Sequence, residues 1–188
     1  MGILETRRIR LRPIEEKDFP ILHMWRNEVE YIKMCSNRRN PVNFEKFVAE
    51  LKHDSQKNRH LQLLIEIQEK NISIGTIFSF DLNFTDGYVF IAIYLTSEYQ
   101  KRGYGAEAGI LFLCYLFDHF PLHKIYFETF GYNRHSLSTL KTAKFIEEGR
   151  FKEHRFFEGE RHDVIRFAAY RSCLTKMKKI LSRFQVFK

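Results

Sequence analysis

The chain has few cysteines, glycines and prolines, the residues that cross-link small proteins or interrupt their helices and strands. Its 188 residues include three cysteines, Cys35, Cys114 and Cys173, an odd number without paired spacing. Neither a disulfide framework nor a zinc site is expected from them, and we predict a reducing compartment. Only 9 glycines and 4 prolines are present, a content that excludes collagen-like and low-complexity chains.

Long apolar runs are also missing. The longest covers residues 110–117 and is too short to span a bilayer. Residues 1–8 contain no apolar signal core. We therefore expect a cytoplasmic protein. The eight histidines show no metal-ligand pattern such as His-Glu-x-x-His, so no metal is predicted.

What the chain does have is an ordinary globular composition with an excess of positive charge. It is 44% hydrophobic and 29% charged, with 19 phenylalanines and a net charge of +8. The length suits one well-buried core, and we expect residues 1–171 to form a single domain followed by a basic amphipathic tail at residues 172–188. The charge favours anionic partners, among them coenzyme A, a nucleotide sugar, RNA or an acidic protein.

The hydrophobic pattern predicts a mixed α/β sheet. Strands are expected at residues 8–13, 61–67, 72–80, 88–95 and 124–130, and in a closing hairpin of residues 145–157 and 162–170. Helices are expected at residues 15–29, 44–51, 103–120 and 136–143. In the tail, apolar residues recur at helical spacing. This pattern favours a terminal helix packed on the body over a membrane-surface or partner-binding helix.

A glycine-containing turn joins the strand at residues 88–95 to the long helix. Glycines allow close approach of the backbone, and the free amides at a helix start attract a pyrophosphate. Taken alone, such a turn is as consistent with a tight turn that carries solvated basic residues. Its residues are Gln100, Lys101, Arg102, Gly103, Tyr104, Gly105 and Ala106.

In its context along the chain, this turn resembles the pyrophosphate motif of the Gcn5-related N-acetyltransferase (GNAT) superfamily. Ser97-Glu98-Tyr99 before it is similar to the RimJ/RimL-like branch. The remaining matches are Leu11-Arg12-Pro13, Trp25-Arg26-Asn27, Ile74-Gly75, residues 122–126, Glu147-Glu148-Gly149, Gly159, His162 and Asp163. The resemblance covers nearly the whole chain except the tail.

The resemblance implies the GNAT fold, an α+β arrangement with a mixed, mostly antiparallel twisted sheet flanked by helices and with splayed fourth and fifth strands. It also implies acetyl-CoA as cosubstrate. The pantetheine arm would lie along Ile93, Tyr94 and Leu95, and the turn would hold the pyrophosphate. Asn133 and Ser136 match positions that contact coenzyme A, although Asn133 also suits a helix cap.

Acetyl transfer to an amine needs a base, because an alkylamine is protonated near neutral pH. Glu128 matches the catalytic glutamate of a ribosomal-protein acetyltransferase subgroup; the competing interpretation is a solvated carboxylate paired with a lysine. Two departures concern proton transfer. Leu140 replaces the tyrosine that protonates the thiolate in the family, so water, Tyr132 or His135 would have to supply that proton. Phe90 stands where the branch often has a glutamate, which could have served as a second base. Lys144 stands at a position that is commonly glycine.

The acceptor is expected to contact the first helices and the closing hairpin, chiefly through Trp25, Arg26, Asn27 and Tyr31. With Arg38, Arg39, His154, Arg155 and Arg161 they form a basic rim, which disfavours a polyamine and suits a phosphate or carboxylate. We predict an N-acetyltransferase, monomeric or homodimeric, acting on a primary amine of an amino-sugar nucleotide or a protein N-terminus. Alternatives are a non-catalytic acyl-CoA-binding module and, less favoured, a nucleic-acid-binding protein.

Overall fold

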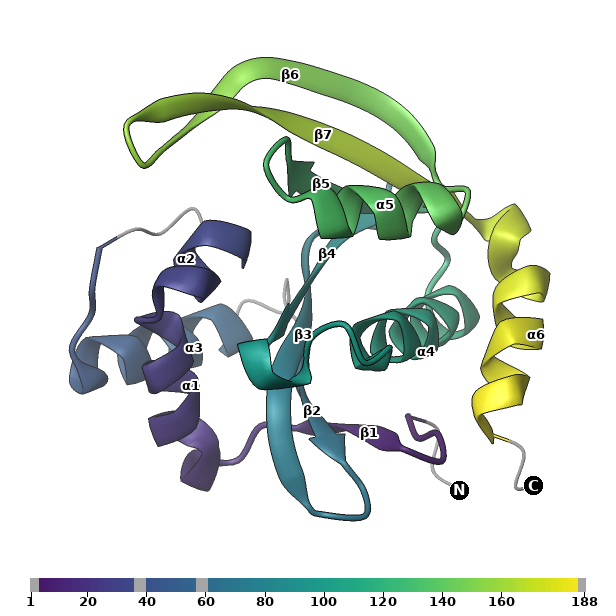
Figure 1. Ribbon diagram of the computed structural model, residues 1–188. Coiled ribbons are helices and arrows are strands. Elements are labelled where there is room, and N and C mark those ends of the chain that lie inside the picture. Colours follow the sequence, from purple (N-terminus) through teal and green to yellow (C-terminus); the bar gives the residue numbers. More distant parts are fainter. Residues whose placement is uncertain (1–3, 36–39, 57–60, 186–188) are drawn as a thin grey trace.

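A seven-stranded sheet with helices on both faces forms the body of the computed structural model, which describes residues 4–35, 40–56 and 61–185 (Figure 1). The strand order is β1-β2-β3-β4-β5-β7-β6. Only β4 and β5 pair in parallel; the other neighbours are antiparallel. The strands are β1 (Ile9–Pro13), β2 (Gln62–Ile67), β3 (Ile72–Asn83), β4 (Tyr88–Leu95), β5 (Lys124–Phe130), β6 (Ile146–Phe157) and β7 (Glu160–Tyr170). The predicted fold class is confirmed.

Two groups of helices cover the sheet from opposite sides (Figure 1). On one face lie α1 (Phe19–Arg26), α2 (Val29–Cys35) and α3 (Phe44–Gln56). On the other lie α4 (Tyr104–His119), α5 (Arg134–Thr142) and α6 (Leu174–Gln185). The short turns of helix are η1 (Glu16–Asp18), η2 (Ser97–Tyr99) and η3 (Arg171–Cys173).

The two faces of β4 show why the helices divide in this way. Val89 and Ile91 point into the core beneath α4, whereas Phe90 and Tyr94 lie in clusters on the opposite face, because side chains alternate along a strand. Met177 and Leu181 of α6 belong to the same core as α4. Helix α6 is therefore packed on the body.

One predicted helix was wrong. Residues 15–29 were expected to form a single helix, but they form η1 and α1, and a separate helix α2 follows. The interruption lies at Asn27, whose Nδ2 donates to the Val42 carbonyl (3.1 Å) and whose Oδ1 accepts from the Val42 amide (2.9 Å). These bonds tie the end of α1 to the segment before α3. The partner of Asn27, Val42, lies 15 residues further along the chain. Helical periodicity therefore could not predict the interruption.

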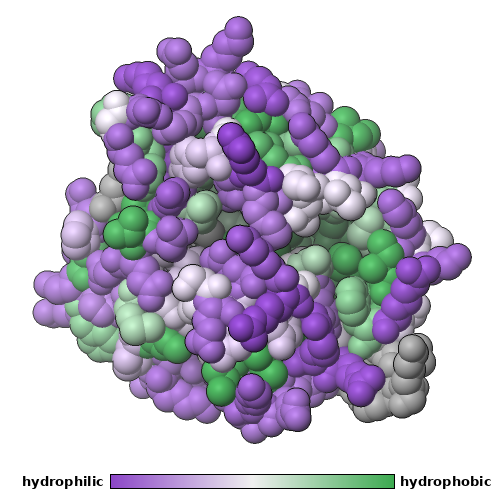
Figure 2. All heavy atoms as spheres, in the orientation of Figure 1, coloured by the Kyte–Doolittle hydropathy of each residue, from purple (hydrophilic) through white to green (hydrophobic). Residues whose placement is uncertain are grey.

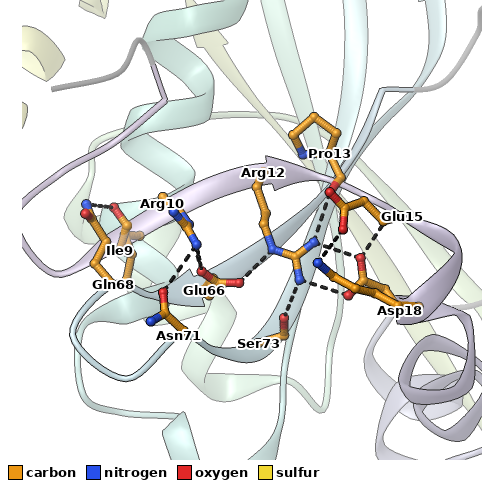
Figure 3. A network of polar contacts seen from close by, with 11 residues as sticks. Ile9, Arg10, Arg12, Pro13, Glu15, Asp18, Glu66, Gln68, Asn71 and Ser73 are labelled. Atoms are coloured by element: carbon orange, nitrogen blue, oxygen red, sulfur yellow. Dashed lines mark hydrogen bonds and ion pairs between the residues drawn. The ribbon is translucent and has the colours of Figure 1, made fainter.

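A buried ionic network holds the start of α1 against the sheet (Figure 3). The Arg12 guanidinium donates to both Asp18 oxygens (2.7 and 2.8 Å) and to Glu66 Oε2 (2.6 Å). Arg10 donates to Glu66 Oε1 (2.7 Å). Both carboxylates are buried, so each needs its charged partners to offset the loss of water. The network fixes α1 above β1 and β2.

Lys144, at the position where the family commonly has glycine, follows α5 with φ at 62°. The left-handed conformation is strained for a residue with a Cβ atom. Lys144→Gly is expected to raise the free energy of unfolding by about 1 kcal/mol, measured by urea denaturation. Lys141→Gly, within α5, should lower it by about 1 kcal/mol. Destabilisation by both changes would contradict the assignment of strain to Lys144.

Candidate active site

Strands β4 and β5 separate part-way along their length. Their paired residues are Tyr88–Lys124, Val89–Ile125 and Phe90–Tyr126, and no later pair is formed. The Thr96 amide donates to Ile74 of β3, so by alternation the backbone groups of Ile93 and Leu95 face the gap left by β5. The sheet thus opens beyond Phe90, and an extended ligand could add to the exposed side of β4.

The predicted turn lies at the open end of this gap. Gly103 has a left-handed conformation with φ at 83° and precedes the first turn of α4, which no side chain caps. Lys101 and Arg102 are exposed beside it, whereas Gly105 packs near Leu95. Uncapped amides and the positive end of the α4 dipole make this turn a site for an anionic group. Gln100 closes the turn, because its side chain donates to the Leu95 carbonyl (2.9 Å).

Arg8 braces the turn from the start of β1, a role that the sequence did not reveal. Its Nε donates to Glu107 Oε2 (2.7 Å), and its guanidinium lies 4.5 Å from the Tyr104 ring centroid. Glu107 is fully buried in the first turn of α4 and also accepts a bond from Thr6. An ion pair across 99 residues has no local sequence signal. It ties the start of α4 to the edge strand of the sheet.

The opposite face of β4 carries an aromatic and acidic cluster. The Tyr94 ring packs 5.8 Å from Trp25 and 5.0 Å from Tyr31, and its hydroxyl donates to Glu28. Tyr94 was predicted beside Ile93 and Leu95 as a coenzyme contact. Alternation instead turns its backbone toward β3 and its side chain toward α1 and α2. The Tyr94 side chain therefore lies on the α1–α2 side of the sheet.

Glu128 lies on β5 beyond the point of separation, on the same face as Phe90 and Tyr126. Its side chain is 31% exposed and pairs with Arg166 on β7, not with a lysine. Both hydrogen bonds from Arg166 reach Oε1, at 3.0 and 2.7 Å. Among the described residues, no donor reaches Oε2. The ion pair thus fixes the carboxylate and leaves one oxygen available for a ligand.

Tyr132 and Asn133 follow the carboxyl end of β5, a few residues after Glu128. The Asn133 side-chain oxygen caps α5 by accepting from the Ser136 amide (3.1 Å). Its Nδ2 has no partner within the described ranges, so a cap and a ligand contact can coexist. The Tyr132 hydroxyl donates to the Lys33 carbonyl (2.6 Å). This bond engages its proton, which makes Tyr132 a poor acid for a leaving thiolate.

The β6–β7 hairpin reaches across to α2 (Figure 1). Arg155 is buried, its guanidinium lies 3.8 Å from the Phe130 ring centroid, and Nη2 donates to the Ile32 carbonyl (2.7 Å). Together with Tyr132, this contact joins the hairpin to the end of α2. Arg155, expected on the rim, is therefore a structural bridge. Arg38 and Arg39 lie outside the described residues, whereas His154 and Arg161 are exposed on the hairpin.

Comparison with known proteins identifies this arrangement. A family model described as acetyltransferase (GNAT) domain matches residues 8–146. The chain belongs to the GNAT family. It is accordingly an acetyl-CoA-dependent acetyltransferase. No match was found among curated proteins.

Solved structures share this GNAT fold. The spermidine N-acetyltransferase from Vibrio cholerae, in complex with CoA and spermine, is 21% identical with a TM-score of 0.83, covering 89% of this chain and 98% of its own. RimL, a ribosomal L7/L12 alpha-N-protein acetyltransferase in complex with coenzyme A, is 17% identical with a TM-score of 0.78, covering 89% and 96%. A GCN5-related N-acetyltransferase from Brucella melitensis is 20% identical with a TM-score of 0.77, covering 96% and 83%. These identities establish the fold alone.

Two features distinguish this GNAT domain from the pattern expected for the superfamily. Leu140 is buried against Ile165 and Phe167, so the position expected to hold a tyrosine serves the core. Phe90 lies 4.9 Å from the Tyr126 ring and 4.8 Å from the Arg166 guanidinium. The residue expected to be a second base therefore supports the arginine that holds Glu128.

No helix in the described part of the chain is long and apolar enough to cross a membrane. Within the same ranges, no group of three or more His, Cys, Asp or Glu side chains could hold a metal ion. Cys114 is buried in α4, and burial raises the pKa of its thiol to about 11. A thiol of this kind is protonated near neutral pH and is a poor nucleophile.

Proposed function

We propose that this GNAT domain transfers the acetyl group of acetyl-CoA to a primary amine, with Glu128 as the base. The observation that supports this proposal is the Glu128–Arg166 ion pair. It leaves Glu128 Oε2 available to a ligand, on the part of β5 that has separated from β4. The pantetheine arm would lie along Ile93 and Leu95. The amides at the start of α4, with Lys101 and Arg102, would hold the pyrophosphate, and Asn133 Nδ2 remains able to contact the coenzyme.

In this proposal, the coenzyme lies on the β4 side of the gap and the base lies on the β5 side. Acetyl-CoA supplies an activated thioester. Glu128 Oε2 accepts the proton of the incoming ammonium, directly or through water, so that the nitrogen lone pair is available to attack the carbonyl carbon. The carbon–sulfur bond then breaks, and the nitrogen releases a second proton to solvent as the neutral amide forms. The thiolate takes a proton from solvent, since Leu140 cannot donate one. Arg166 acts as a positioning residue for Glu128.

The acceptor would enter from the α1–α2 side, where Tyr31 packs on the buried Tyr94 and Tyr94 packs on the buried Trp25. Figure 2 shows mainly hydrophilic residues over the face drawn in Figure 1, with a recess near its centre where paler and apolar residues are visible. We favour an amino-sugar nucleotide or a protein N-terminus as acceptor, in keeping with a RimJ/RimL-like domain. Asn27, whose amide is engaged with Val42, would fix the end of α1 without contacting the acceptor.

Thiol release from acetyl-CoA, measured with a thiol reagent, tests the activity. The panel should include amino sugars, their phosphates and nucleotide forms, N-terminal peptides and spermidine. Release above the hydrolysis background with at least one amine, and an acetylated product by mass spectrometry, is expected. Coenzyme binding without turnover of any amine would favour a non-catalytic acyl-CoA-binding module.

Gly103→Ala tests the turn. A Cβ atom is disfavoured at a φ of 83° by about 1–2 kcal/mol, and the strain should shift the amides that receive the pyrophosphate. We expect the affinity for CoA, measured by isothermal titration calorimetry, to fall by about tenfold. Gly159→Ala is the matched control, because Gly159 has the same φ of 83° at the tip of the β6–β7 hairpin. Equal loss of affinity in both variants would contradict the assignment.

A further inference from the structure

Arg26 is a buried cation without a partner among the described residues. The residue is 7% exposed, and its Nη1 is buried without a hydrogen bond. No acidic side chain in the described ranges lies within ion-pair distance of its guanidinium, although Arg8, Arg12 and Arg166 all have carboxylate partners. Arg155 and Arg171 donate to backbone carbonyls, whereas Arg26 donates no hydrogen bond within the described ranges.

Arg26 lies on the buried face of α1, the face that packs toward the sheet. The buried residues of α1 are Leu22, Trp25 and Arg26, which follow the i, i+3, i+4 spacing of one helix face. Trp25 on this face packs against Tyr94 of β4. The turn that would hold the coenzyme's pyrophosphate starts α4, on the opposite face of the sheet.

An arginine cannot relieve burial by losing its proton, because its guanidinium remains charged at every physiological pH. Removing such a charge from water without a counter-charge is strongly unfavourable. Where a protein keeps such a residue, a ligand that brings the missing negative charge is the direct physical explanation. A guanidinium also matches the planar, two-oxygen geometry of carboxylate and phosphate.

We infer that Arg26 binds an oxyanion, a phosphate or carboxylate, that belongs to the acceptor. This inference rests on the proposed acetyl transfer and narrows its acceptor to amines that carry a negative group near the reacting nitrogen. It disfavours a polyamine, which would bring further positive charge toward an uncompensated guanidinium. Arg26 is accordingly a specificity residue.

The test compares wild type with Arg26→Met, a substitution that keeps length and apolar bulk but removes the charge. Thermal unfolding is followed with and without inorganic phosphate, in protein saturated with CoA so that the turn is already filled. Phosphate should raise the Tm of wild type but not of Arg26→Met. Without phosphate, the variant should unfold at the wild-type Tm or higher, because it no longer buries an unpaired charge. Arg183→Met, at an exposed position of α6, controls for general screening and should keep the phosphate response.

Kinetics with a matched pair of acceptors, glucosamine and glucosamine 6-phosphate, give the second arm. Arg26→Met should lower kcat/KM for the phosphorylated amine by about 10-fold to 100-fold relative to the neutral one. Arg26→Lys should recover part of the preference. A phosphate response that is equal in wild type and Arg26→Met, or that disappears once CoA is bound, would overturn the inference. Because the thermal shift needs no turnover, an Arg26-dependent response without any acetylation would refute the proposed transfer while the anion site remained.

Discussion

Replacement of Glu128 by glutamine is expected to lower kcat about 100-fold or more while the affinity for CoA stays within twofold of wild type. The amide keeps the size of the side chain and can still accept a bond from Arg166, but it cannot take a proton from an ammonium group. At high pH, where more of the amine is already neutral, the difference between variant and wild type should shrink. Steady-state kinetics from pH 6 to pH 10 and calorimetry with CoA provide the measurements.

Glu147→Gln is the matched control for this experiment. Glu147 lies on β6, is 35% exposed and is paired with Arg150, so its environment resembles that of Glu128 except for the distance from the gap. The control should retain wild-type kcat. An Arg166→Met variant should lower kcat less than Glu128→Gln, because the base is present but no longer held. A Glu128→Gln enzyme with normal kcat at neutral pH would exclude Glu128 as the base.

Loss of Arg12 is expected to be the most destabilising single change in the ionic network. Arg12→Met leaves Asp18 buried without its bidentate partner and Glu66 with Arg10 alone. Removing one member of a buried ion pair costs about 3–5 kcal/mol, and urea denaturation at pH 7 should show a loss of that size. Lys17→Met, which removes an exposed partner of Glu15, should cost less than about 1 kcal/mol.

The same network predicts how stability depends on pH. The hydrogen bond from Arg12 lowers the pKa of Asp18, and bonds from Arg12 and Arg10 lower the pKa of Glu66 although burial opposes them. A folded pKa below the unfolded value means that the contribution is complete above the unfolded pKa, about 4 for a carboxyl group, and is lost as pH falls through the folded pKa. The difference between wild type and Arg12→Met should therefore diminish from pH 7 to pH 3. A constant difference would contradict this origin.

Local patterns were sufficient to predict the elements that frame the site. The bounds of β4 and β5 were predicted residue for residue, because apolar runs between polar turns determine both strands. The left-handed Gly103 and the uncapped start of α4 also follow from short-range sequence. The sequence thus contained enough information for the fold and for the conformation of the turn that starts α4.

Contacts between distant segments could not be predicted in this way. Glu128 meets Arg166 because β5 and β7 align these two residues directly across the sheet, a register set by the whole hairpin. Arg8 and Glu107 meet only after β1 has packed beneath α4. The burial of Arg26 likewise depends on how α1 lies on the sheet. Periodicity predicts which face of an element is apolar, whereas the partner of a charged residue depends on tertiary packing.

The central claim, that coenzyme A binds in the gap beside β4 and at the start of α4, is tested most directly by hydrogen–deuterium exchange with and without CoA. The account predicts that CoA slows amide exchange in peptides that cover residues 91–106, with weaker protection at residues 128–136. Protection that is absent there and confined instead to residues 117–123, which line a shallow cavity at the other end of α4, would contradict it.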